Sequence, residues 1–148
     1  MAAITATQGP SLRRQATAQA TTGQTDWLDV PKWARYVQVF LSVSATAGTT
    51  PILTPSFLAA DPISRDDGRV INVAEHAALT GITGAAEYVF EIGPGLTGIA
   101  NDVTNAAAAD SYVQINALLP ALLGVKILND RTTGDETYTY NLSVEFKA

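Results

Sequence analysis

The chain has 148 residues, of which 47% are hydrophobic and 16% charged, and its formal net charge is −5. This length fits one domain, and a chain of this size buries roughly 68–70% of its unfolded surface, so a core can form without covalent staples. The absence of cysteine excludes disulfides, thiolate nucleophiles and cysteine-ligated zinc. The charged share lies below the roughly 25% usual for soluble domains, which favours a surface covered by neighbours in an assembly.

The charges are unevenly placed along the chain. Residues 1–25 carry Arg13 and Arg14 and no acid, whereas the rest of the chain carries 7 bases and 14 acids. An acidic body repels nucleic acid and anionic lipid, so we expect neither as a partner. The basic pair is either a solvated pair on a tail or an anchor that docks on an acidic partner surface.

The first 24 residues are rich in Thr, Ala, Gln and Gly, with Ile4 and Leu12 as the large apolar exceptions. Such a segment cannot bury enough surface to offset its ordering entropy. We therefore predict an extended or flexible N-terminal arm over residues 1–24 and a β-sandwich domain over residues 25–148. The arm has no apolar run typical of a secretory signal, and the longest apolar stretch, 117–125, is shorter than the about 18 residues of a membrane span.

The first strong strand signal is a strict two-residue alternation over Tyr36–Ser44. Val37, Val39, Leu41 and Val43 fall on one face, which predicts a strand with that face buried. The other face carries Gln38, Phe40, Ser42 and Ser44. A second strand is predicted over Ile52–Ala60, and because Pro51 and Pro55 each remove a backbone donor, we expect it at a sheet edge or bulged.

The later part of the chain alternates between strand and turn signals. Tyr88, Phe90 and Ile92 share one face of a predicted strand over Glu87–Ile92, which Gly93, Pro94 and Gly95 end. Short strands are expected over 70–73 and 77–79, then over 112–117 and 124–128. Residues 96–111 have no amphipathic period and are predicted to form a long loop, or a loop with one helical turn.

The last predicted strand, Thr137–Phe146, alternates over its whole length. Its core face consists of Tyr138, Tyr140, Leu142, Val144 and Phe146, and its outward face is polar. Seven or eight short strands with regular turns predict an all-β fold, an antiparallel β-sandwich of jelly-roll or immunoglobulin-like type.

Catalytic and cofactor motifs are weak. Gly93–Gly98 matches G-x-G-x-x-G, but no helix or βαβ unit follows to hold a pyrophosphate, so a loop between strands is favoured. His76 is the lone histidine, with no nucleophile elbow to pair with, although a small hydrolase with a site around it is one hypothesis. We expect no catalytic residue, cofactor or transition-metal site.

Two acidic stretches and two tryptophans can be interpreted either as binding sites or as structural features. The acidic stretches 66–68 and 129–136 could supply calcium ligands, but neither has EF-hand spacing, and turns need the same residues. Trp27 and Trp33 could form a sugar platform, although Trp33 precedes the strongest strand, which favours packing in a core or interface.

The runs VPKWARYVQVFLSVSATAGTTPIL, GITGAAEYVFEIGPG and LPALLGVKILNDRTTGDETYTYNLSVEF resemble strands of small virion proteins of tailed bacteriophages. The resemblance spans residues 25–147. It implies a decoration or cement protein on the capsid surface, made in the host cytoplasm, that binds the major capsid protein or other virion proteins. It also implies a homo-oligomer, with a trimer favoured.

The function predicted from the sequence is therefore structural rather than catalytic, with attachment to a phage head shell as its mechanism. Arg13, Arg14, Trp27 and Trp33 are the candidate partner contacts. A tail-tube or head-fibre component and a carbohydrate-binding β-sandwich module remain as alternatives.

Overall fold

The structure is a computed structural model that describes residues 12–20, 23–60, 70–75, 82–96, 100–105, 108–129 and 133–148. The strands in these parts of the chain are β1 (Leu12–Gln19), β2 (Gly23–Asp29), β3 (Tyr36–Ala47), β4 (Leu53–Ala60), β5 (Val70–Glu75), β6 (Ala86–Gly93), β7 (Ala100–Asn105), β8 (Ala108–Asn116), β9 (Leu122–Asn129) and β10 (Thr137–Lys147). No helix occurs within the described residues.

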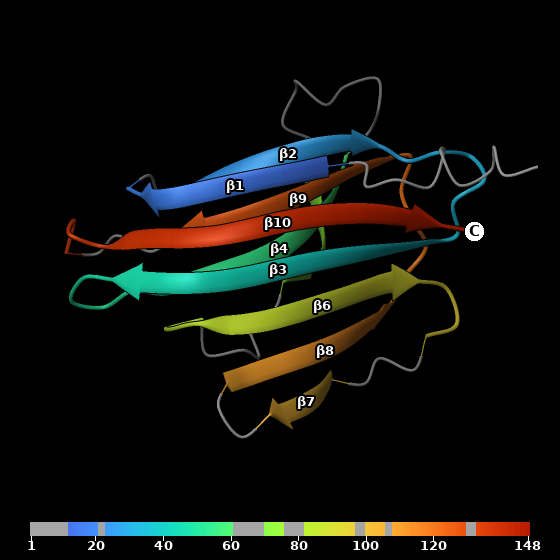
Figure 1. Ribbon diagram of the computed structural model, residues 1–148. Helices are drawn as coiled ribbons and strands as arrows, with labels where there is room; N and C mark the ends of the chain where they lie inside the picture. Colours follow the sequence, from blue (N-terminus) through green and yellow to red (C-terminus); the bar gives the residue numbers. More distant parts are fainter. Residues whose placement is uncertain are drawn as a thin grey trace, which may run out of the picture.

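The strands form two sheets that lie one behind the other (Figure 1). The six-stranded sheet has the order β1-β10-β3-β6-β8-β7, and the four-stranded sheet has the order β2-β9-β4-β5. Their facing sides enclose one hydrophobic core with residues from both sheets. The predicted all-β sandwich is therefore confirmed.

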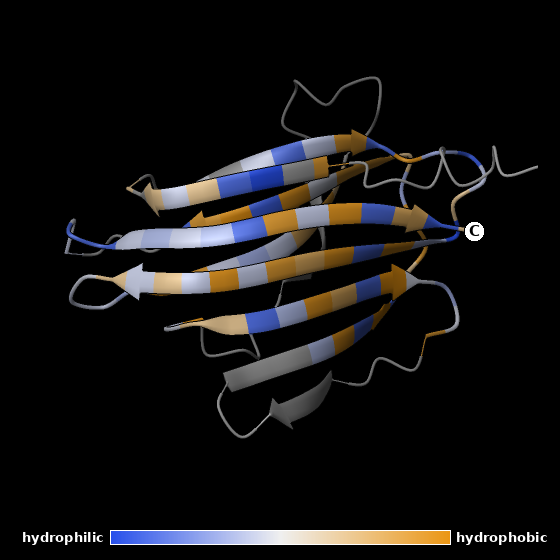
Figure 2. Ribbon diagram, in the orientation of Figure 1, coloured by the Kyte–Doolittle hydropathy of each residue, from blue (hydrophilic) through white to orange (hydrophobic). Residues whose placement is uncertain are grey.

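The strands with the clearest sequence alternation lie in the middle of the six-stranded sheet. β10 pairs with β3, and β3 with β6, all antiparallel. The predicted core faces of all three strands are buried, while their other faces are partly or fully exposed. Figure 2 shows the resulting alternation of hydrophobic and hydrophilic residues along these strands. The period of two thus placed the centre of the fold correctly.

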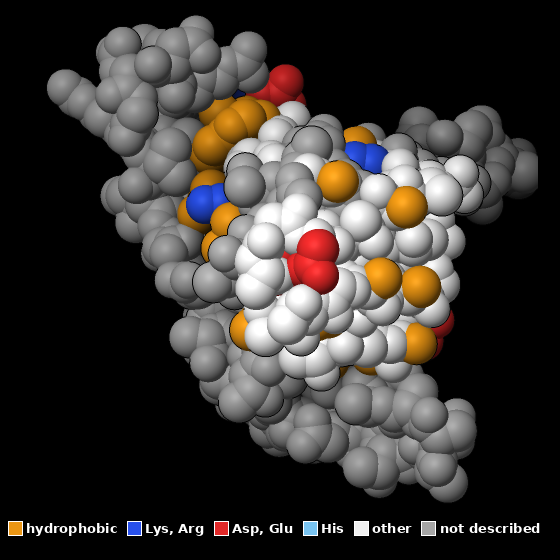
Figure 3. Space-filling view, turned by 90° about the vertical axis from the view of Figure 1, so that its left-hand side faces the viewer, with side chains coloured by type: hydrophobic (Ala, Val, Ile, Leu, Met, Phe, Trp, Pro, Cys, Tyr) orange, Lys and Arg blue, Asp and Glu red, His pale blue; other side chains and the backbone are white. Residues whose placement is uncertain are grey.

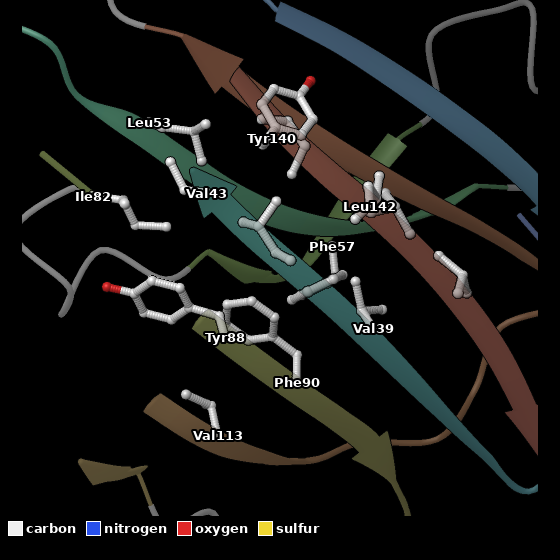
Figure 4. Close-up of a cluster of buried hydrophobic side chains, with 14 of the residues drawn as sticks. Val39, Val43, Leu53, Phe57, Ile82, Tyr88, Phe90, Val113, Tyr140 and Leu142 are labelled. Atoms are coloured by element: carbon white, nitrogen blue, oxygen red, sulfur yellow. The ribbon is translucent and has the colours of Figure 1, made fainter. Parts of the chain in front are cut away.

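Aromatic side chains join the two sheets. The rings of Phe57 on β4 and Phe90 on β6 meet edge to face, with centroids 5.2 Å apart and an interplanar angle of 61°. Tyr88 stacks beside Phe90 on the same face of β6, at a centroid distance of 6.0 Å. Figure 4 shows this cluster with Val39 and Leu142 around it. Aromatic pairs in these geometries stabilise a core beyond the area they bury.

Tyr138 and Tyr140 of β10 are buried, and the hydroxyl group of each has a hydrogen-bond partner. The Tyr138 hydroxyl accepts a hydrogen bond from the Ile52 backbone N–H at 2.8 Å and donates one to the Ile52 carbonyl at 3.0 Å. This pair of bonds ties β10 to the segment that leads into β4. A buried hydroxyl without such partners would cost free energy.

The prediction of a long loop over residues 96–111 is wrong. β7 and the first half of β8 occupy this stretch as an antiparallel hairpin, and β8 continues along β6 in parallel. The sandwich is therefore not purely antiparallel. The segment ANDVTN…AADS has no alternation of large apolar residues and therefore no strand signal of its own, but β8 pairs with β6, and β7 pairs with β8.

The second strand was expected at a sheet edge or bulged, and the structure shows the bulge rather than the edge position. β4 lies between β9 and β5, and its pairing with β5 shifts register between Phe57 and Leu58. The N–H and carbonyl of Leu53 both point to Ile82, away from β9. By alternation, the backbone of Pro55 points the same way, and pairing with β5 starts only at Ser56. The missing donor of Pro55 therefore interrupts no ladder.

The boundary predicted between residues 24 and 25 falls inside β2. Residues 12–19 of the segment predicted as an arm are extended, and they pair with β10 as the edge strand β1 of the six-stranded sheet. The division into arm and domain stays a prediction. The strand expected over residues 77–79 lies outside the described residues.

Candidate interaction surfaces

Arg14 is directed toward the interior at the open edge of the sandwich. Its Nη1 lies 2.6 Å from Asp26 Oδ2, and the two side chains are 12% and 17% exposed. Its Nη2 donates a hydrogen bond to the Tyr140 hydroxyl at 3.0 Å, and its guanidinium lies 5.6 Å from the centre of the Tyr140 ring. Burial is the main reason that the pKa of Tyr140 is raised. Arg14 is thus occupied within its own chain.

The other predicted contact residues have different surroundings. The backbone of Arg13 pairs with Ser143, and its side chain lies outside the described part of the structure. Trp27 is half-buried on the outer face of β2, where its ring lies over Gly124 of β9. A Cβ at position 124 would lie 2.7 Å from Trp27 Cζ3, so the missing side chain makes room for the ring. Trp33 is 47% exposed in the segment between β2 and β3.

Trp33 and Leu118 are two exposed large apolar residues at the same end of the sandwich, which we call the apolar end. Leu118 is 80% exposed in the segment between β8 and β9. The two segments lie side by side because the Val30 N–H donates a hydrogen bond to the Ala121 carbonyl at 3.0 Å. Figure 1 shows them at the end of the molecule where β2, β6 and β10 finish. Exposed large apolar residues that gather on one surface often mark an interaction site, whereas singly exposed ones are common.

Basic side chains surround the apolar end. Lys32 and Arg35 are exposed beside Trp33 in the sequence, and Lys147 is exposed at the end of β10. The Arg35 N–H donates a hydrogen bond to the Lys147 carbonyl at 2.8 Å, which places both residues at this end. Asp29 is an exposed acid at the end of β2. Among the described residues, the end therefore combines two apolar side chains with more basic than acidic side chains, on a chain with net charge −5.

The opposite end of the sandwich is closed by an acidic turn. Glu136 is buried, and its carboxylate accepts hydrogen bonds from the backbone N–H groups of Thr133 and Gly134 at 3.1 and 2.9 Å. Asp135 accepts hydrogen bonds from the side chain and backbone of Thr49. The Thr133 hydroxyl bonds to both carboxylates and is the main reason that their pKa values are lowered. The acids of this turn are therefore occupied by the protein itself.

Figure 3 views this second end of the molecule, where acidic side chains lie at the centre among atoms drawn white, which are backbone and other side chains. Hydrophobic side chains gather instead on the left of that view, over the four-stranded sheet. The sequence offered residues 129–136 as possible calcium ligands. In the described part of this stretch, the acids are instead hydrogen-bonded within the turn. The other candidate stretch, 66–68, lies outside the described residues, as does His76. Within the described parts of the chain, no group of three potential metal ligands comes together.

The glycine motif forms a turn at the end of β6. Gly95 has a φ of 78°, a conformation that glycine adopts without strain, and its N–H donates a hydrogen bond to the Asn116 side chain at 2.9 Å. The turn connects β6 to the segment before β7, so its described residues are those of a loop between strands. Residues 97–99 of the motif region lie outside the described part.

The outer face of the six-stranded sheet contains a hollow around Phe40 that the sequence analysis did not single out. Phe40 lies in β3 on the polar side of the alternation and is 37% exposed. The signal was present in the sequence, because an aromatic residue at an outward strand position stands out among Gln38, Ser42 and Ser44. Leu118 had no comparable signal, since it lies within the apolar run 117–125.

Comparison of the chain with protein-family models, with curated proteins and with solved structures found no match. Among the described residues, no helix is long and apolar enough to cross a membrane.

Proposed function

We propose that this protein is a structural, non-catalytic component of a phage virion, a decoration or cement protein that attaches to the head shell. The observation that carries the proposal is the apolar end, where Trp33 and Leu118 are 47% and 80% exposed on adjacent segments. The hydrogen bond from the Val30 N–H to the Ala121 carbonyl holds the two segments together, and tryptophan is among the residues that contribute most at protein interfaces.

The charges around the apolar end support a protein partner with an acidic surface. Lys32, Arg35 and Lys147 would lie at the rim of the contact, where complementary charges mainly increase the association rate and the specificity. This assigns the attachment to the end of the sandwich rather than to Arg14, whose guanidinium already binds Asp26.

The assignment to a virion is supported by the resemblance of residues 25–147 to phage virion proteins, by the β-sandwich fold and by the low charged share of 16%. The partner is then the major capsid protein, and the protein acts as a homo-oligomer, with a trimer favoured. A tail-tube or head-fibre position would use the same apolar end against a different neighbour.

Co-sedimentation of the purified protein with phage heads prepared without it tests the proposal. Trp33→Ser and Leu118→Ser each should weaken binding by about tenfold or more, as for the central residues of protein interfaces. Leu128→Ser is the matched control, because Leu128 is 41% exposed but lies on β9 of the four-stranded sheet. Equal binding of all variants would contradict attachment through the apolar end.

A further inference from the structure

The hollow on the outer face of the six-stranded sheet has a volume of 530 Å³. This is within the range of roughly 300–1,000 Å³ that is usual for small-molecule sites. The residues that line it come from β1, β3 and β10: Arg14, Gln15, Phe40, Ser42, Asn141, Leu142 and Ser143. The described lining residues thus lie on the edge strand β1 and on its two inner neighbours, β10 and β3.

Strand register explains why these side chains gather. Gln15 pairs with Asn141, which pairs with Ser42, so one row of uncharged polar residues crosses three adjacent strands. In the neighbouring row, Ser143 pairs with Phe40. Residues opposite each other in antiparallel strands have their Cβ atoms roughly 4.5–5.5 Å apart, and the two rows are two residues, or roughly 6.6 Å, apart along each strand, so both rows can contact one ligand.

The hydrogen-bonding groups in the hollow are available. Within the described part of the chain, the side chains of Gln15, Asn141 and Ser143 have no hydrogen-bond partner. The Ser42 hydroxyl donates to Glu87 Oε1 at 2.6 Å and keeps its lone pairs as acceptors. Amides and hydroxyls both donate and accept, which is the pattern that sugar hydroxyl groups require.

Among the side chains that the structure describes, the lining of the hollow offers no free charge. Arg14 is the charged residue among the lining residues, and its guanidinium is held by Asp26 and Tyr140. Glu87, which is exposed next to Ser42, disfavours an anionic ligand at that side. The exposed ring of Phe40 supplies an apolar surface between the polar groups. Together these features fit a ligand that is neutral, rich in hydroxyl groups and apolar on one face.

We propose that this hollow binds a neutral oligosaccharide. One sugar ring packs its C–H face on Phe40, and its hydroxyl groups bond to the amides of Gln15 and Asn141 and to the hydroxyl of Ser143. The hollow lies on the side of the sandwich, whereas Trp33 and Leu118 lie at its end, so a protein attached through its apolar end keeps this face accessible. The inference therefore goes beyond attachment and does not depend on it.

Titration of the ¹⁵N-labelled full-length protein with neutral hexasaccharides, followed by NMR, tests the site. The probes are maltohexaose, cellohexaose, xylohexaose and chitohexaose. At least one should shift amide resonances of β1, β3 and β10 around the hollow. Phe40→Ala should weaken its binding by about tenfold or more, and Asn141→Ala by about threefold to tenfold, the loss expected for one hydrogen bond.

Leu128→Ala is the matched control for an exposed large apolar residue on the other sheet and should leave oligosaccharide binding unchanged. Ser44→Ala serves the same purpose for an exposed polar residue on β3, outside the hollow. The folded state of each variant is checked by the dispersion of its own NMR spectrum.

Three results would overturn the proposal: no shifts with any hexasaccharide, shifts confined to other surfaces, or equal binding by Phe40→Ala. If Phe40→Ala changes the oligomer mass in sedimentation while no hexasaccharide binds, the face contacts protein and the proposal is likewise wrong. Attachment to heads is tested separately by the Trp33 and Leu118 variants, so failure of one proposal does not imply failure of the other.

Discussion

Arg14 and Asp26 form an ion pair of 2.6 Å that connects the edge strand of one sheet to the edge strand of the other. β1 and β2 are consecutive in the chain but belong to different sheets, so the pair closes the open side of the sandwich beside Tyr140. Both side chains are mostly buried, so loss of one partner costs more unfolding free energy than it would in a solvated surface pair.

Asp26→Ala should lower the free energy of unfolding by about 1–3 kcal/mol, because it leaves a mostly buried guanidinium without its carboxylate. Urea denaturation followed by circular dichroism measures this change. Asp29→Ala is the control, since Asp29 lies on the same strand and is exposed; its effect should stay within about 0.5 kcal/mol. Equal stabilities of the two variants would show that the ion pair contributes nothing.

Sequence patterns predicted the strands that bury one face against the core. Tyr36–Ser44 and Thr137–Phe146 alternate strictly, and in the structure they pair with each other at the centre of the six-stranded sheet. The second half of β8 was predicted as a strand over 112–117, but β7 and the first half of β8 could not be predicted in this way, because their residues are mostly small or polar. Local periodicity does not report a parallel pairing between segments that are separated by a further strand.

Gly124→Ala should lower the free energy of unfolding by about 1–3 kcal/mol, because the added Cβ overlaps the Trp27 ring. The test is a double-mutant cycle with Trp27→Ala, measured by urea denaturation. In the Trp27→Ala background the clash is gone, and alanine at position 124 should be neutral or stabilising, as alanine usually is relative to glycine in a strand. Additive effects of the two substitutions would mean that the ring does not occupy the space over Gly124.

The acidic turn predicts a loss of stability in acid. The pKa values of Asp135 and Glu136 are lowered in the folded protein from their ordinary values of 3.8 and 4.5, chiefly by the Thr133 hydroxyl. The unfolded chain therefore binds more protons in this range. The stabilisation is complete above about pH 4.5 and is lost as the pH falls through the lowered folded values.

Urea denaturation at a series of pH values between 7 and 3 measures this dependence. The Asp135→Asn/Glu136→Gln variant should show a weaker decline of stability below about pH 4.5 than the unchanged protein, because it lacks both titrating groups. Thr133→Ala should lie between the two. Parallel curves for all three proteins would contradict the role of this turn.

Removal of residues 1–24 deletes β1 and the first residues of β2, so we expect the unfolding free energy to fall as the ion pair and the β1–β10 pairing are lost. Removal of residues 1–11 leaves every described contact in place and is the control. Thermal unfolding of both truncated proteins measures the difference. A deletion of residues 1–24 that unfolds at the temperature of the full chain would support an independent arm.

Part of the candidate surfaces could be predicted from the sequence. Trp33 was singled out and is exposed, whereas Arg14, predicted as a partner contact, binds Asp26 within the chain. The partner of Arg14 lies on a strand of the other sheet, and no spacing in the sequence reveals that two consecutive strands separate into different sheets. The gathering of Gln15, Phe40 and Asn141 likewise depends on strand register, which requires the tertiary structure.

The central claim is that this sandwich attaches to a virion through its apolar end. Electron microscopy of the native phage particle, at a resolution that traces strands, tests it most directly. We expect the sandwich on the head surface, in several symmetry-related copies, with Trp33 and Leu118 buried against an acidic surface of the capsid protein. A particle in which this chain is absent, or in which both residues face solvent, would contradict it.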